Sequence, residues 1–182
     1  MFETECELPE VYLQPGEAHF ALEPTVIRTI LGSCVGITFW CARTGAGALC
    51  HALLPRCPKN SCAGLDPSAG RRYVDFAVGD LARQFDKLGV PRSEVQVKVF
   101  GGADVLPINA AGCLRPTIGK QNCEAALEVL RAEGFCVAAG SLGGTKGRSI
   151  QFHTGTGEVR LRWLAQAGRK GGVDATVSEG RR

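Results

Sequence analysis

The chain has 182 residues, of which 45% are hydrophobic and 21% charged, a composition typical of a folded domain with a core of its own. A formal net charge of +3 is too small to indicate a nucleic-acid surface, and no run of about 18 apolar residues predicts a membrane span. The first residues are acidic where a secretory signal is basic, so we expect a cytoplasmic protein. The nine cysteines are an odd number, and without an export signal we expect their thiols to be reduced.

The first part of the chain predicts short strands followed by a flexible loop. Runs that are β-branched or alternate in polarity occupy residues 19–22, 25–31, 35–41 and 47–54, and Pro24, Gly32 and a turn at 43–45 separate them. Residues 56–72 are rich in proline, glycine, serine and asparagine, which argues against regular structure there.

The second part predicts helices that alternate with strands. Helical spacing of apolar residues indicates amphipathic helices over 73–88 and 119–133, and strands are expected over 95–100, 135–139, 149–153 and 158–164. The last two strands are joined by a hairpin turn at 154–157. We therefore predict a single α/β domain over residues 1–167, with mixed sheets and covering helices, and a disordered tail over 168–182.

A cysteine among small residues is the candidate catalytic group. Cys34 lies between Gly32 and Gly36 at a break between two strands, and His51 lies on the strand that returns toward it. A neighbouring imidazole would make the thiol a good nucleophile at neutral pH, which suggests acyl transfer. Because no acid occurs between Thr25 and His51, the hydroxyl of Thr29 is the candidate group that orients the imidazole.

Three other interpretations of these residues have to be weighed against this one. Cys34 and His51 could be ordinary core residues, since free cysteine is among the most buried residue types. A zinc site would draw on His51 and on cysteines that lack Cys-x-x-Cys spacing, namely Cys41, Cys50, Cys57 and Cys62. Finally, the segment from Gly32 to Gly36 looks like a nucleophile elbow with cysteine in the serine position and His153 as its base, but only 33 residues precede Cys34, too few for the strands and helices that come before the elbow in that fold.

Five motifs resemble, in the same order, those of the CheD chemoreceptor glutamine deamidases, over roughly residues 15–164. They are Thr29 with 31–35, then 51–55, 100–103, 118–122 and 143–148. The resemblance implies layered mixed β-sheets with flanking helices, a cysteine hydrolase fold shared with the catalytic domain of bacterial cytotoxic necrotizing factors. It also implies that Cys34 is the nucleophile, His51 its histidine and Thr29 the catalytic threonine.

The activity implied by this resemblance is the hydrolysis of glutamine side chains to glutamate through a Cys-His thioester. The family's substrates are the cytoplasmic helices of methyl-accepting chemotaxis proteins, and no metal or cofactor is required. Some members also bind the phosphatase CheC, so a non-catalytic adaptor that binds a CheC-type phosphatase is the alternative. Ser141 departs from the family pattern, which commonly has an acidic residue there.

Overall fold

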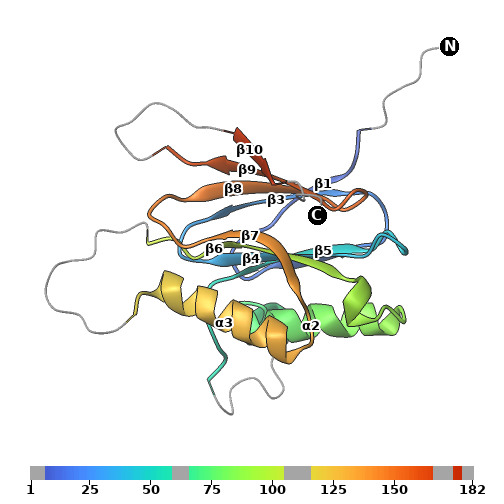
Figure 1. Ribbon diagram of the computed structural model, residues 1–182, viewed down its shortest axis with the longest axis horizontal. Coiled ribbons are helices and arrows are strands. Elements are labelled where there is room, and N and C mark those ends of the chain that lie inside the picture. The colour runs from blue at the N-terminus through green and yellow to red at the C-terminus, as the bar shows by residue number, and fades with distance from the viewer. Residues whose placement is uncertain (1–6, 59–65, 105–115, 166–173, 178–182) are drawn as a thin grey trace, which may run out of the picture.

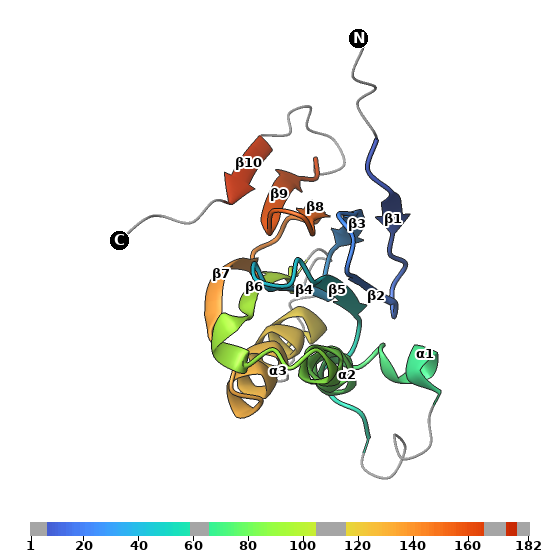
Figure 2. The same ribbon diagram turned by 90° about the vertical axis from the view of Figure 1, so that its right-hand side faces the viewer.

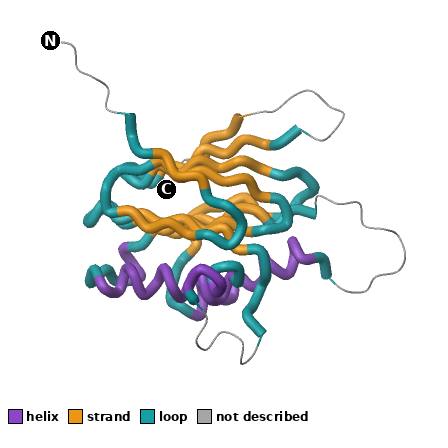
Figure 3. Tube along the Cα trace, turned by 180° about the vertical axis from the view of Figure 1, so that it is seen from behind, coloured by secondary structure: helices purple, strands orange, loops and turns teal. Residues whose placement is uncertain are grey.

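The computed structural model describes residues 7–58, 66–104, 116–165 and 174–177, and these form three layers. Two five-stranded sheets stack face to face, and two helices cover the far side of one of them (Figures 1 and 3). We call the sheet between the other two layers the central sheet and the remaining one the outer sheet. Layered mixed sheets with flanking helices, as the sequence predicts, are confirmed. A likeness to cytotoxic necrotizing factors stays a prediction.

The outer sheet has one buried and one solvated face. Its strand order is β1 (Glu10–Tyr12), β3 (Val26–Leu31), β8 (Arg148–His153), β9 (Glu158–Trp163) and β10 (Asp174–Val177), and only β1 and β3 pair in parallel. Along β3 the side chains of Ile27, Thr29 and Leu31 are fully buried, whereas Arg28 and Ile30 are exposed. This alternation is typical of a sheet packed on one side, and it directs Thr29 toward the central sheet.

The central sheet is covered on both faces. Its order is β2 (Ala18–Ala21), β5 (Gly47–Ala52), β4 (Val35–Trp40), β6 (Gln96–Gly101) and β7 (Val137–Leu142), with β6 and β7 parallel. All six residues of β5 are buried. Leu49 belongs to the core between the sheets, and its neighbours Ala48 and Cys50 belong to the core under the helices. Because side chains alternate along a strand, His51 faces the outer sheet, as Leu49 does.

The helices lie side by side beneath the central sheet (Figure 2). They are α2 (Val74–Lys87) and α3 (Ile118–Ala132), with the single turn α1 (Pro67–Gly70) before them and the 3-10 turn η1 (Arg92–Glu94) after α2. Leu81 and Phe85 of α2 and Leu130 of α3 are fully buried in the core under the sheet. Within the described residues, no helix is both long and apolar enough to cross a membrane.

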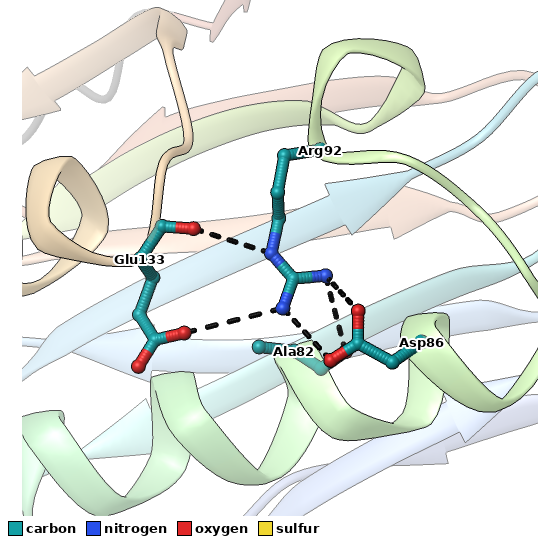
Figure 4. Close-up of polar contacts among 4 residues, drawn as sticks. All are labelled: Ala82, Asp86, Arg92 and Glu133. Atoms are coloured by element: carbon teal, nitrogen blue, oxygen red, sulfur yellow. Dashed lines mark hydrogen bonds and ion pairs between the residues drawn. The ribbon is translucent and has the colours of Figure 1, made fainter.

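Arg92 ties the carboxyl ends of the two long helices together (Figure 4). Its guanidinium forms a bidentate ion pair with Asp86 near the end of α2. Its Nε donates to the carbonyl of Glu133, directly after α3, at 3.2 Å. The same guanidinium stacks over the ring of Phe135, 4.7 Å from its centre. A cation at a helix carboxyl end also interacts favourably with the helix dipole. This contact holds α2 and α3 side by side below the central sheet.

The predicted elements are largely confirmed. Strands occur at each of the four early runs and at the three closing ones, and the turn at 154–157 joins β8 to β9. Both amphipathic helices are present, with bounds that differ from the prediction by one residue. Three elements before the tail were not predicted: β1, which pairs with β3, α1, which interrupts the segment expected to lack regular structure, and the short turn η1.

Two sequence-based expectations are wrong. Residues 174–177, expected to be disordered, form β10 and pair with β9, because the edge of β9 offers unpaired main-chain groups to a passing segment. The rest of the predicted tail lies outside the described residues. Cys57, expected to be a free thiol, is disulfide-bonded.

Removal of β10 is therefore expected to destabilise the domain. A chain that ends after Gln166 loses the main-chain hydrogen bonds between β9 and β10. We expect its thermal midpoint to fall by a few degrees, which corresponds to a loss of about 1 kcal/mol in the free energy of unfolding for a domain of this size. Differential scanning calorimetry measures the shift, with a chain that ends after Val177 as the control. An unchanged midpoint in the shorter chain would show that the pairing adds nothing to stability.

Candidate active site

Cys34 lies in the turn that carries the chain from the outer sheet to the central one. Leu31 ends β3 and Val35 begins β4, so the cysteine belongs to a link between two strands. A nucleophile elbow joins a strand to a helix, and that interpretation is therefore wrong. The Cys34 side chain is partly exposed and packs against the core between the sheets.

The glycine pair after β6 holds this turn in place. The amide of Gly102 donates to the carbonyl of Cys34 at 2.7 Å, and the amide of Ala103 donates to the carbonyl of Gly32 at 2.8 Å. Gly101 and Gly102 have φ angles of +107° and +66°, a region that favours glycine. A Cβ on Gly101 would lie 2.1 Å from the carbonyl oxygen of Cys34. The sharp turn predicted at these glycines thus serves the close approach of two backbones.

The strand register brings Cys34 and His51 into the same layer. Gly36 of β4 lies opposite His51 of β5, and Val35 lies opposite Ala52. Val35 faces the helices, so Gly36 and Cys34, on either side of it, face the outer sheet. Cys34 packs against the core between the sheets, so the thiol and the imidazole lie on the same side of the central sheet.

His51 is held through its main chain and through one ring nitrogen. Its main-chain amide donates to the carbonyl of Glu17 at 2.8 Å, and its carbonyl accepts from the amide of Gly16 at 2.7 Å. Its Nδ1 lies 2.7 Å from the Oγ1 of Thr29, and the side chains of both residues are buried. The predicted contact between Thr29 and His51 is confirmed.

The hydrogen bonds assign the tautomer of His51. Thr29 has one hydroxyl proton, which it donates to the carbonyl of Leu13 at 2.9 Å. Its oxygen must then accept from Nδ1–H, which leaves the lone pair on Nε2. This Nε2 is buried and has no hydrogen-bond partner among the described residues. A neutral imidazole with a free Nε2 lone pair is the form that accepts a proton.

Burial keeps both groups uncharged at rest. Burial raises the pKa of the Cys34 thiol, an effect that its own main-chain amide reduces. Burial also lowers the pKa of His51, against smaller opposing effects of Leu13 and Glu17. At neutral pH the resting pair is therefore a thiol and a neutral imidazole, and the thiol proton must move during attack.

This charge state predicts the pH dependence of Cys34 alkylation. Because the thiol pKa is raised, the iodoacetamide rate at Cys34 should climb from neutral pH to beyond about pH 9 with no plateau. His51→Ala should slow the reaction at Cys34 near neutral pH and leave the exposed Cys136 unchanged as an internal reference. Peptide mass spectrometry gives both rates. A plateau already reached in mild acid would indicate a preformed thiolate–imidazolium pair and contradict this description.

A second loop supports the glycine pair. The amide of Gly143 donates to the carbonyl of Gly101 at 2.9 Å, and the fully buried Arg148 donates to the carbonyls of Ser141 and Gly143. The Ser141 hydroxyl accepts from the same guanidinium at 3.0 Å. The guanidinium also stacks on the ring of Trp163, with its central carbon 4.8 Å from the ring centre. Ser141 thus supplies two acceptors to Arg148, its carbonyl and its hydroxyl. Sequence reasoning missed Arg148, whose basic side chain gave no sign that it is buried.

The remaining candidate residues lie elsewhere. His153 is on the solvated face of β8, where its Nε2 lies 3.0 Å from Nε2 of Gln151, and His19 is on the edge strand β2. Cys50 points toward the helices and away from His51, and Cys57 is in a disulfide. In the part of the chain that the structure describes, no three histidine, cysteine or acidic side chains are grouped to hold a metal ion.

A half-buried thiol and a buried imidazole with a free Nε2, both on the same side of the central sheet, are the groups from which cysteine hydrolases build a nucleophile and its base. The chain belongs to the CheD family: residues 53–163 match the family described as CheD chemotactic sensory transduction. It is 44% identical to the probable chemoreceptor glutamine deamidase CheD 2 of Geobacter sulfurreducens, over 87% of this chain and 92% of that protein. It is 36% identical to the probable chemoreceptor glutamine deamidase CheD of Maridesulfovibrio salexigens, over 90% of this chain and 97% of that protein.

Proposed function

We propose that this protein is a chemoreceptor glutamine deamidase that converts glutamine side chains of methyl-accepting chemotaxis proteins to glutamate. The observation that carries the proposal is the Thr29–His51 hydrogen bond of 2.7 Å, because it leaves Nε2 of His51 as a base in the layer that Cys34 faces. The names of the relatives give the substrate class.

The first half of the reaction forms a thioester. The Sγ of Cys34 attacks the carboxamide carbon while Nε2 of His51 takes the thiol proton. The carbonyl π electrons move to the oxygen, and we propose main-chain amides of the nucleophile turn as the donors that stabilise this oxyanion. The tetrahedral intermediate then collapses, the C–N bond breaks, and His51 gives its proton to the departing ammonia. Thr29 accepts from Nδ1–H throughout and holds the ring in one orientation.

The second half releases glutamate. Water attacks the thioester carbon and gives one proton to Nε2 of His51, and the C–S bond of the second tetrahedral intermediate breaks. The proton returns to the sulfur, so that one water is consumed and one ammonia released in each cycle. The thiol and the neutral imidazole are restored, which is the charge state that burial favours at rest.

The setting of this reaction follows from its substrate. We propose that the targets are the cytoplasmic helices of chemoreceptors, which would place the protein in the cytoplasm. Binding of a CheC-type phosphatase stays a prediction of the family resemblance. A purely non-catalytic adaptor would not need Thr29, Cys34 and His51 together in one layer, so the geometry favours the enzyme.

The test is mass mapping of a receptor fragment. A purified cytoplasmic domain of a chemoreceptor is incubated with and without the protein, digested and searched for glutamines that gain the mass of an amide-to-acid conversion. The expected result is conversion at a few defined glutamines, with ammonia released in equal amount. An unmodified fragment, with the protein folded and in excess, would refute the proposal.

A further inference from the structure

Asn122 joins the two segments that carry the nucleophile and the base. It lies on α3, and its side chain is fully buried. Its Nδ2 donates to the carbonyl of Ser33 at 2.9 Å and to the carbonyl of Leu53 at 2.8 Å. Ser33 directly precedes Cys34, and Leu53 follows His51 by two residues. One amide group therefore connects the nucleophile turn to the strand of the imidazole.

The position of this bridge relative to the sheet is informative. The pairing of β4 with β5 ends at Val35 opposite Ala52, one residue short of the position at which Cys34 would face Leu53. Beyond that point Cys34 leaves the strand, and the ladder has no further hydrogen bonds to hold the two chains together. The side-chain amide of Asn122 supplies two hydrogen bonds instead, at the point where Cys34 turns away from β5.

The hydrogen bonds also fix the orientation of the Asn122 amide. Both acceptors are carbonyl oxygens, so only the NH2 group can face them, and both of its protons are used. Oδ1 is then buried without a partner among the described residues. A buried acceptor without a partner is costly, and an apolar residue of similar size would avoid that cost. The side chain is thus suited to bridging rather than to packing.

We propose that Asn122 is a positioning residue, which holds the Cys34 turn in register with His51 so that the thiol proton can pass to Nε2. The inference rests on the proposed function for its link to turnover. Proton transfer requires the two groups within hydrogen-bond reach, and a displacement of about 1 Å can cost roughly 100-fold in rate. The rest of the site stays in place without Asn122, because α3 is seated against Gly102 through Gly119, where a Cβ would lie 2.6 Å from the carbonyl oxygen of Gly102.

The test compares Asn122→Ala with Gln121→Ala. Gln121 is the adjacent amide on α3, and its Nε2 donates to the carbonyl of Pro116 at the amino end of the helix. We expect Asn122→Ala to lower kcat about 10- to 100-fold with little change in KM, and to slow iodoacetamide at Cys34 but not at Cys136. Gln121→Ala should match the wild type in every measurement. In a His51→Ala background, Asn122→Ala should add little, because it acts through the pair.

Asn122→Asp supplies a signature that a purely structural role would not give. The aspartate is of nearly the same size, has no donor when ionised and one donor when protonated. The ratio of its Cys34 alkylation rate to the wild-type rate should therefore rise as the pH falls. Circular dichroism and thermal melting establish that each variant is folded. If Asn122→Ala does not fold, the alkylation rates of Asn122→Asp still test the proposal.

The two arms separate this inference from the proposed function. The alkylation rate needs no substrate, so it tests Asn122 even if the receptor fragment is not deamidated. A folded Asn122→Ala with wild-type alkylation at Cys34 would overturn the positioning role, whatever the fate of the deamidase proposal. Equal losses in the wild-type and His51→Ala backgrounds would also overturn it, because the effect would then not pass through the imidazole.

Discussion

His51→Ala is expected to abolish deamidation almost as completely as Cys34→Ala. The imidazole takes the thiol proton, returns it to ammonia and activates water, so its loss affects every proton transfer in the cycle. General acid–base catalysis by one side chain contributes roughly 100- to 10,000-fold, and a half-buried thiol with a raised pKa depends on its base more than a fully exposed one. Ammonia release from a receptor fragment, with folding checked by circular dichroism, measures the loss.

The double variant Cys34→Ala with His51→Ala should be little worse than either single variant. Residues that act as one unit lose function together and not additively. Thr29→Ala should cost less, because it removes the acceptor for Nδ1–H and frees the ring to change tautomer without removing the base. Thr29→Ser keeps the hydroxyl and should recover most of the activity. A well-folded His51→Ala with wild-type turnover would show that the assignment of the base is wrong.

Residue type and spacing made the central part of this site predictable from sequence. Cys34 precedes one short strand and His51 lies on a strand that returns toward it, which predicts that the thiol and the imidazole lie close together. Thr29 is expected beside His51 because no acid occurs between Thr25 and His51, and the structure places the two residues on facing strands of different sheets. The tautomer could not be predicted, because it depends on the carbonyl of Leu13, which sequence does not locate.

The supporting residues could not be predicted for a different reason. Asn122 is 89 residues from Ser33 and 69 residues from Leu53 along the chain, and nothing local marks a helix amide as a bridge between two strands. Arg148 is fully buried among main-chain carbonyls, whereas a basic residue after a glycine-rich turn is expected at the surface. The tail strand β10 was missed because its pairing depends on the free edge of β9 and not on its own composition.

Gly101→Ala is expected to damage both stability and activity. The residue has φ +107°, a conformation that costs other residues about 1–3 kcal/mol, and the new Cβ would lie 2.1 Å from the carbonyl oxygen of Cys34. That oxygen is main chain and cannot swing aside as a flexible side chain would, so the nucleophile turn must shift. The hydrogen bond from Gly102 to Cys34 then lengthens or breaks. We expect turnover to fall by about 100-fold or more, because the thiol leaves its register with His51.

Gly89→Ala separates strain from displacement of the nucleophile. Gly89 also has a left-handed conformation, at φ +64°, but nothing lies within 4 Å of a Cβ at that position, at the end of α2. It should therefore lose stability by about 1 kcal/mol with unchanged turnover and an unchanged alkylation rate at Cys34. Thermal melting and ammonia release on both variants make the comparison. If Gly101→Ala lost no more activity than Gly89→Ala, the close approach at Cys34 would have no part in aligning the thiol, and the glycine pair would serve only to end β6.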